Sequence, residues 1–322
     1  MVEFKFETQD WYTDAGQTKT PKAPITVAPD CPHLDARIAT TPQCRADTGF
    51  AKLSWPKTIW FFAMLIGWIG LGSVFFTWNA VGIFFLTAIV TLCGGHSLGM
   101  HRLFIHQSYS CPKWLYYFGV WLGTIVGLGG PLTMMRSHDL RDWAQRQPKC
   151  HAFPAQSEQK LKDFFWQVCC QWENPNGPHY KYAAHAIEDP IIIFLQRTAF
   201  LQQLPLAILL FLWGGWGFVA WGICGRVVVS ITGHWAVGWY AHNHLSHSPI
   251  AYVQDGAAVQ GRNVPWVALF TFGEAWHSNH HAFPWSARIG LSPKEWDPGW
   301  WVLRGLEKIG LVKNVKIAAE YT

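Results

Sequence analysis

The chain has 322 residues with a formal net charge of +5, and only 14% of them are charged while 50% are hydrophobic. Soluble proteins carry about 25% charged residues, so the composition argues against an ordinary soluble protein and indicates contact with a membrane. The length suffices for one large domain or two ordinary ones, and the small charge excess gives no reason to expect a nucleic-acid partner.

Residues 1–54 are polar and show no sustained periodicity, so we expect them to form a polar cytosolic N-terminal tail. The first residues are acidic and no basic stretch leads into an apolar one, which predicts that there is no cleaved signal peptide. The eight cysteines contain no CxxC pair and are expected to be reduced thiols facing the cytosol.

Two uncharged apolar runs follow, at 58–78 and 80–95, with almost no loop between them. About 20 apolar residues cross the hydrocarbon core as a helix, so the pair predicts a transmembrane hairpin. A second pair, at about 199–215 and 218–241, repeats the pattern around an uncharged GGWG turn. Lys and Arg flank both pairs, and the positive-inside rule therefore predicts both termini on the cytosolic side.

Three further segments carry structural signals. The run 115–135 has five glycines and a proline, and we interpret it as a re-entrant or in-plane segment on the cytosolic side, with a full span as the alternative. Asp189 followed by Pro190 predicts a helix start. Ser292 to Glu295 reads SPKE, a capping-box pattern. The stretch after it starts with Asp297 and Pro298 and has spaced apolar residues, which predicts an interfacial helix within the C-terminal segment 292–322.

Histidines gather just beyond the expected cytosolic ends of the spans. His277 lies one helical turn before both His280 and His281, whose directions diverge by about 100° and can therefore serve two neighbouring metals. His101 and His106 share no face of a continuous α-helix, so they converge only if the helix ends between them or if they bind different metals. Further histidines in these clusters are His96, His138, His151, His234, His242, His244 and His247.

Isolated histidines such as His33, His179 and His185 are given no role, because a lone histidine is usually a surface or hydrogen-bonded residue. Clusters that recur at one membrane face are hard to obtain by chance and indicate metal binding. Imidazole-rich sites with few thiolates suit Fe, Zn or Cu. Seven or more histidines exceed the needs of one metal, which favours a dinuclear centre.

The stretches GMHRLFIHQSY and GEAWHSNHHAFP resemble the first and last histidine boxes of the membrane-bound fatty acid desaturases, nearest the acyl-CoA (stearoyl-CoA-type) branch. The resemblance covers about residues 55 to 312. It implies an all-α integral membrane fold of four transmembrane helices, arranged as two hairpins, with a cytosolic helical cap that holds a non-haem di-iron centre. We accordingly expect the divisions 1–54, 55–291 for the transmembrane domain and 292–322.

The same resemblance implies metal-ligand roles for a set of histidines: His101, His106, His138, His242, His277, His280 and His281. It also implies two Fe ions, O₂ as co-substrate, and electrons from a partner. No haem-binding segment or cluster-type cysteine pattern is present in the sequence, so the donor is expected to be a separate protein such as a ferredoxin or a small haem cytochrome. The substrate is expected to be a fatty-acyl group on CoA, on a carrier protein or on a membrane lipid.

The middle box departs from the HxxHH pattern of that family, because Arg141 and Asp142 stand where two histidines are expected. Arg has no lone pair to donate and cannot be a ligand, whereas Asp142 is a candidate ligand. His234, His151, His96 and His244 are further candidates to complete the metal shell. Glu274 and Arg141 are expected to support the ligands. The basic stretch Arg136, Arg141, Arg146 and Lys149 predicts either a docking surface for an acidic donor or a solvated loop.

These features favour O₂-dependent desaturation of a fatty-acyl chain. A lipid hydroxylase or ketolase on the same scaffold is the alternative enzyme, because the fate of the substrate radical depends on its placement. A non-catalytic membrane protein that binds metal or lipid, with a decayed middle box, is the alternative from another class.

Overall fold

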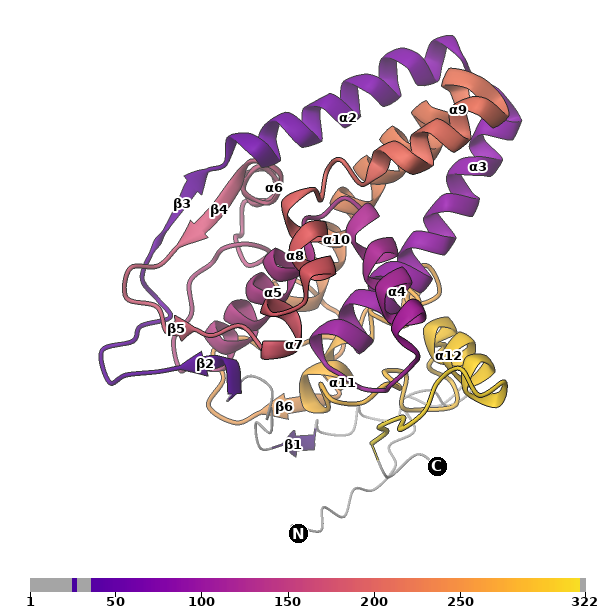
Figure 1. Ribbon diagram of the computed structural model, residues 1–322. Helices are drawn as coiled ribbons and strands as arrows, with labels where there is room; N and C mark the ends of the chain where they lie inside the picture. Colours follow the sequence, from indigo (N-terminus) through magenta and orange to yellow (C-terminus); the bar gives the residue numbers. More distant parts are fainter. Residues whose placement is uncertain (1–24, 28–35, 319–322) are drawn as a thin grey trace, which may run out of the picture.

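The computed structural model describes residues 25–27 and 36–318, and it is mostly helical (Figure 1). The longer helices are α2 (Trp55–Val74), α3 (Trp78–Ile89), the π-helix η1 (Val90–Ile105), α4 (Lys113–Ile125), α5 (Pro131–Arg146), α6 (Lys160–Cys169), α8 (Pro190–Arg197), α9 (Gln203–Val219), α10 (Arg226–His242) and α12 (Pro298–Lys308). The shorter ones are α7 (Ala184–Ile187), the π-turn η2 (Ala220–Gly225), the 3₁₀ turn η3 (Pro265–Val267) and α11 (His277–Ala282).

The first expected hairpin is formed by α2 and α3. Helix α2 ends at Val74, and Thr77 begins α3 by accepting a hydrogen bond from the backbone N–H of Ala80 on its side-chain oxygen. Helix α3 continues without a break into η1, so that Trp78–Ile105 form one stretch of 28 residues. The short connection predicted from the two apolar runs is therefore present.

Residues 203–242 form a helical stretch of 40 residues through α9, η2 and α10, within which Gly214 and Gly215 leave helical geometry. A Cβ atom at Gly222 would lie 2.7 Å from the side chain of Leu210. Twelve residues of straight helix span about 18 Å, so this contact requires the chain to reverse between them. The GGWG segment is thus a turn, as its sequence predicted.

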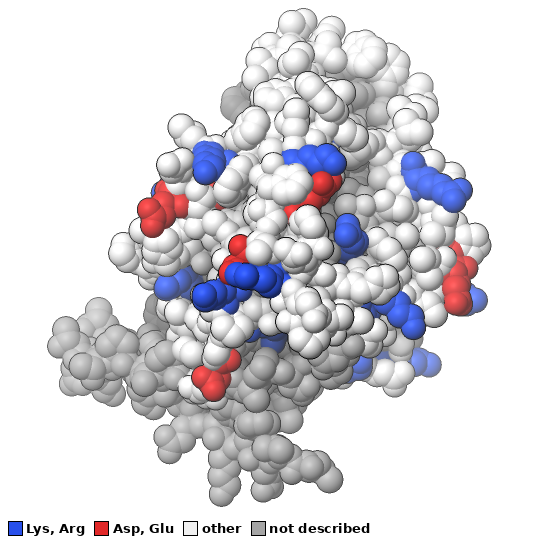
Figure 2. Space-filling view, turned by 90° about the vertical axis from the view of Figure 1, so that its left-hand side faces the viewer, with Lys and Arg blue, Asp and Glu red and all other residues white. Residues whose placement is uncertain are grey.

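Within the described part of the chain, three helical stretches are long and apolar enough to cross a membrane: Trp55–Val74, Trp78–Ile105 and Gln203–His242. Their surfaces are apolar, since Trp55, Ile66 and Val74 of α2 expose 65%, 69% and 74% of their area. In Figure 1 the ends of α2 and α9 and the start of α3 project from the rest of the molecule, and Figure 2 shows no charged side chain at that end in its view. These features confirm a membrane protein.

The run 115–135 is broken, not a continuous span. Helix α4 has 13 residues, too few to cross the hydrocarbon core, and Gly127 and Gly129 have φ of +94° and +152° in the turn before α5 begins at Pro131. Helix α4 packs closely on η1, because the backbone of Gly119 leaves no room for a Cβ atom at Gly99. This packing positions α5 beside the end of η1.

Arg226, the cation inside the fourth apolar run, is fully buried within the helical bundle. Its Nη1 donates to the carbonyl of Ile125 over 2.6 Å, its Nη2 to Oε1 of Gln203 over 2.6 Å and its Nε to the carbonyl of Gly222 over 2.9 Å. The cation therefore faces the bundle and joins α10 to the end of α4.

Six short strands depart from the predicted all-α fold. Strand β1 (Ile25–Val27) pairs in parallel with β6 (Tyr252–Gln254), and β2 (Ile38–Ala39) and β3 (Phe50–Leu53) pair antiparallel with β5 (His179–Tyr180) and β4 (Cys170–Glu173). Residues 1–54 were expected to form a tail, but the described strands β1, β2 and β3 within this segment pair with β6, β5 and β4. The rest of that expectation, residues 1–24 and 28–35, lies outside the described residues.

The C-terminal segment contains a helix at the place where Asp297 and Pro298 predicted it. Ser292 and Glu295 do form capping interactions, because Oε2 of Glu295 accepts from the N–H groups of Leu291 and Ser292, but they close a turn and no helix begins there. Helix α12 begins at Pro298, and Asp297 caps it by accepting from the N–H of Trp300. In the same way, Asp189 accepts from the N–H groups of Ile191 and Ile192 and begins α8 as predicted.

Candidate metal centre

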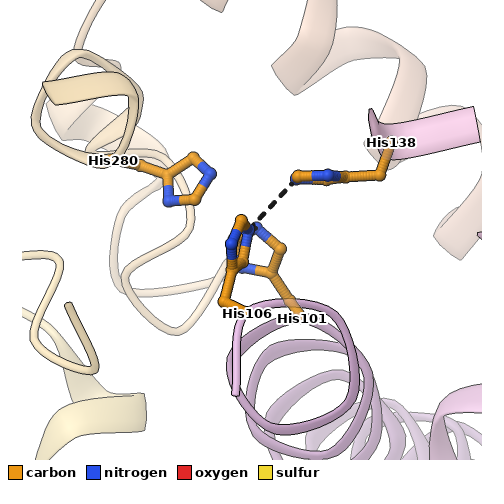
Figure 3. A group of neighbouring side chains, drawn as sticks. All are labelled: His101, His106, His138 and His280. Atoms are coloured by element: carbon orange, nitrogen blue, oxygen red, sulfur yellow. Dashed lines mark hydrogen bonds between the residues drawn. The ribbon is translucent and has the colours of Figure 1, made fainter. Parts of the chain in front are cut away.

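Four histidines from three helices form a first group. His101 and His106 come from η1 and its end, His138 from α5 and His280 from α11, and their rings point toward one space (Figure 3). Nε2 of His106 lies 3.2 Å from Nε2 of His101 and 3.3 Å from Nε2 of His138. One nitrogen of each ring lies within 4.8 Å of the others.

The π-helical geometry of η1 explains how His101 and His106 meet. The N–H of His106 donates to the carbonyl of His101 over 3.0 Å, five residues earlier. In a π-helix this i to i+5 bond brings residues five apart onto one face, whereas an α-helix would separate them. The sequence analysis expected either a helix end between these two histidines or binding to different metals. The end of η1 at Ile105 meets the first condition, and the π-helical geometry was not foreseen.

A second group consists of His242, His277 and His281. Nε2 of His277 lies 2.8 Å from Nε2 of His242 and 3.1 Å from Nε2 of His281. His242 is the last residue of α10, and the other two belong to α11. His280 and His281 are adjacent on α11 and point in different directions, as expected, so each belongs to a different group. Their ring centroids are 5.9 Å apart.

The donor arrangement fits a metal ion in each group. Two nitrogens that bind one metal at about 2.0–2.1 Å lie about 3 Å from each other, which matches the Nε2 separations of 2.8 to 3.3 Å. Both ring nitrogens of His280 are buried without a hydrogen-bond partner among the described residues. Burial holds the pKa of His277 and His280 well below the ordinary value, so these rings are neutral and able to donate a lone pair.

Carboxylates contact the far side of two rings in the first group. Nδ1 of His101 lies 2.5 Å from Oε2 of Glu274, and Nδ1 of His138 lies 3.3 Å from Oδ1 of Asp139. Such contacts fix the tautomer and direct Nε2 toward a metal. Burial opposes ionisation of Glu274, but His101 and Arg102 hold its pKa below the usual range.

Asp142 is buried close to both groups, and its Oδ2 has no hydrogen-bond partner among the described residues. Burial opposes its ionisation, but the charges of His138 and His281 hold the pKa of Asp142 below its usual range. Those two histidines belong to different groups. Asp142 nevertheless lies outside both groups, because neither set of ligand atoms within 4.8 Å of one another includes a carboxylate oxygen. An ionised, unsatisfied carboxylate has the chemistry of a metal ligand.

The other candidate ligands lie outside both groups. The His234 ring contacts His96 with centroids 5.5 Å apart, and the His151 ring packs on Trp172 at 4.3 Å. His244 forms an exposed ion pair with Glu158. The structure therefore does not bring these four histidines to the two groups.

The basic stretch of α5 is not one exposed patch. Arg136 is exposed, whereas Nε and Nη2 of Arg141 are buried and Arg146 donates from Nη2 to the carbonyl of His281 over 3.1 Å. Residues five apart lie on different faces of an α-helix, so these three arginines do not form one surface. Their even spacing in the sequence had suggested that they do.

Five supporting residues were missed in the sequence analysis: Arg37, Arg102, Asp139, Tyr180 and Asp297. Asp139, which contacts His138, also accepts from Nε of Arg37 over 3.1 Å and from the Tyr180 hydroxyl over 2.7 Å. Arg102 makes ion pairs with Glu274 and with Asp297. The one signal available was an Asp directly after a ligand-type His at 138–139, since the other partners come from distant parts of the chain.

With this geometry established, comparison with known proteins identifies the class. A sequence model described as "Fatty acid desaturase" matches residues 76–292, which include all seven grouped histidines. The chain belongs to the fatty acid desaturase family. The predictions of an oxidoreductase and of fatty-acyl desaturation as its reaction are confirmed at that level.

Curated relatives cover most of the chain. An sn-1 stearoyl-lipid 9-desaturase of Anabaena variabilis is 34% identical over 272 residues, which are 83% of this chain and 95% of the relative. An sn-1 stearoyl-lipid 9-desaturase of Synechocystis sp. is 35% identical over 276 residues, 84% of this chain and 83% of the relative. An acyl-CoA 5-desaturase of Anemone leveillei is 29% identical over 282 residues, 83% and 82% of the two chains.

Proposed function

We propose that this protein introduces a double bond into a fatty-acyl chain, using O₂ and two iron ions held by the histidine groups. The observation that carries the proposal is the convergence of seven histidines into two adjacent groups in a chain of the desaturase family. Two iron ions bound there would supply the redox chemistry that activates O₂ and removes hydrogen from an unactivated C–H bond.

His101, His106, His138 and His280 would hold the first iron. His242, His277 and His281 would hold the second, with Asp142 as its fourth ligand. The carboxylates of Glu274 and Asp139 keep a proton on Nδ1 of His101 and His138, so that the Nε2 lone pairs face the metal. Burial of His101, His280 and His281 limits the access of water to the reacting groups.

We propose a topology of four spanning helices with the histidine groups on the cytosolic side. The chain reversal at Gly214 and Gly215 supports a second hairpin within Gln203–His242. Lys52 and Lys57 flank the first hairpin and Arg197 the second, on the side that carries the histidines. Residues 55–291 would form the membrane domain, and residues 1–54 and 292–322 would lie at its cytosolic face.

The substrate and the electron donor extend this proposal. Relatives named for lipid-bound and for CoA-bound acyl chains both support a fatty-acyl substrate, with the acyl carrier left to experiment. The seven described cysteines are free thiols without the spacing of an iron–sulfur site. A separate donor such as a ferredoxin or a small haem cytochrome would therefore supply the electrons.

The test is product analysis by mass spectrometry with purified protein, O₂, a reducing partner and acyl-lipid or acyl-CoA substrates. A product that has lost two hydrogens supports desaturation, whereas one that has gained an oxygen atom supports the hydroxylase alternative. The variant His281→Ala should abolish product, and His234→Ala, from outside both groups, should retain it. Metal content that survives without any O₂-dependent product would refute the enzymatic function.

A further inference from the structure

Arg37, in the segment that precedes the first hairpin, lies beside the first histidine group. Its buried side chain approaches Asp139, which follows His138 directly on α5 and is also buried. Nε of Arg37 lies 3.1 Å from Oδ2 of Asp139, whose other oxygen, Oδ1, lies 3.3 Å from Nδ1 of His138. The ring of His138 points toward the other members of the group (Figure 3). One carboxylate therefore connects the N-terminal segment to a ring of the metal centre.

Tyr180 contacts the same carboxylate. Its hydroxyl donates to Oδ2 of Asp139 over 2.7 Å. Strand β2 pairs with β5 so that Ile38 lies opposite Tyr180. The N–H of Lys181 donates to the carbonyl of Arg37 over 2.8 Å, which extends this pairing by one residue on each strand. The strand pairing therefore brings the guanidinium and the phenol to one oxygen of Asp139.

Arg37 also contacts the helix that carries two more members of the group. Its Nη2 donates to the carbonyl of Ile105, the last residue of η1, over 3.2 Å. Carbonyls in the last turn of a helix lack partners within that helix, and Arg37 supplies one here. One guanidinium thus joins the end of η1, which carries His101 and His106, to α5, which carries His138.

The backbone at Arg37 is held by contacts that do not involve its side chain. Ile38 packs in a core cluster with Trp143 and Ala144 of α5. Further along the segment, β3 pairs with β4. Substitution of Arg37 should therefore remove the contacts of the guanidinium while the segment stays in place.

We propose that Arg37 is a positioning residue for the first iron site, which acts through Asp139 on the ring of His138. Tyr180 supports the same carboxylate. This inference rests on the proposed function, because it requires the first histidine group to hold iron. Its consequence is reciprocal: docking of the N-terminal segment raises the iron affinity of the first group, and bound iron stabilises that docking.

The experiment is anaerobic titration of metal-free, full-length protein in detergent with Fe²⁺. Arg37→Met should lower the affinity for one of the two irons by about tenfold or more and leave the affinity for the other unchanged. Tyr180→Phe, which removes only the hydroxyl, should weaken the same iron by less, and Arg37→Lys should restore part of the affinity. Arg45→Met is the matched control, because Arg45 is 60% exposed in an ion pair with Asp47 of the same segment, and it should bind both irons like wild type.

A double-mutant cycle separates positioning from general loosening of the fold. If Arg37 acts through Asp139, the double variant Arg37→Met with Asp139→Asn should bind iron about as well as Asp139→Asn alone. Tyr180→Phe provides the same cycle where Arg37→Met does not fold. Fully additive losses, or equal losses at both irons, would overturn the proposal. Unchanged iron affinity in Arg37→Met would overturn this inference alone, whereas folded wild-type protein that binds no iron would overturn it together with the proposed function.

Hydrogen exchange measures the reciprocal effect. Bound iron should slow exchange of the Lys181 N–H, which donates to the carbonyl of Arg37, in wild-type protein. The slowing should be smaller in Arg37→Met and should match wild type in Arg45→Met. Exchange at Lys181 that is the same with and without iron in wild-type protein would show that the segment and the first iron site are not coupled.

Discussion

Nδ1 of His101 lies 2.5 Å from Oε2 of Glu274, joining the first histidine box to the last. Glu274 is held in turn by Ser97, whose hydroxyl donates to Oε1 over 2.6 Å, and by Arg102. The carboxylate therefore determines which nitrogen of His101 faces the other rings of the first group. Glu274 thus links the orientation of the His101 ring to the packing of η1 against the segment that precedes α11.

Glu274→Gln should lower the iron affinity of the first group by about 10- to 100-fold, because an amide does not hold the proton on Nδ1 as a carboxylate does. Iron binding is measured by titrating metal-free protein. The matched control is Glu158→Gln, which removes an exposed His–Glu pair with His244. Equal iron affinity in Glu274→Gln and wild type would show that the contact does not orient the ligand.

Asp142→Asn should reduce occupancy of the second group while leaving the first loaded, because a neutral amide is a weaker ligand than an ionised carboxylate. We expect an affinity loss of about 10- to 100-fold for one of the two ions. The measurement is metal content after dialysis against a chelator at increasing concentration. Asp255→Asn, at an exposed aspartate, should behave as wild type, and two retained ions in Asp142→Asn would contradict the ligand role.

Arg226→Met should destabilise the protein by about 2 kcal/mol, because it leaves Oε1 of Gln203 without its buried donor. The carbonyl of Ile125 loses one of its two donors and keeps the other, Nε2 of Gln203. Thermal unfolding in detergent measures the effect. Arg197→Met, at an exposed arginine ending α8, should change stability by less than about 0.5 kcal/mol. Similar unfolding temperatures for both variants would mean that Arg226 does not stabilise the α4 end.

The pH dependence of stability should be weaker in His151→Gln. Burial and the charge of Arg141 lower the pKa of His151 from 6.5 to about 4, so between these values the unfolded chain binds more protons than the native one. The contribution of His151 to the free energy of unfolding is therefore complete above pH 6.5 and is lost as the pH falls toward 4. The free energy of unfolding should fall by up to about 3 kcal/mol over this pH range. Unfolding measured across that range should show the difference, and exposed His179→Gln should match wild type.

The apolar runs and the histidine boxes predicted the hairpins and the grouped side chains well, since both depend on local spacing. Gly214 and Gly215 signalled a turn through their sequence, and His280 and His281 diverge as one helical turn requires. In these places short-range geometry alone determines the outcome.

Other features depend on partners far along the chain. The π-helical geometry that joins His101 to His106 arises where η1 packs on α4, and spacing alone indicates an α-helix. The capping-box pattern at Ser292 closes a turn because its context is not helical. Burial of Arg141 beside Gly238 requires α5 and α10 to be placed side by side, which a linear reading of basic residues does not reveal.

The central claim is that the two histidine groups hold a pair of iron ions. Metal analysis of purified wild-type protein combined with Mössbauer spectroscopy tests it most directly. Wild-type protein should contain two irons per chain in a coupled centre, and His281→Ala should lose at least one of them. A single zinc ion, or no bound metal in correctly folded protein, would contradict it.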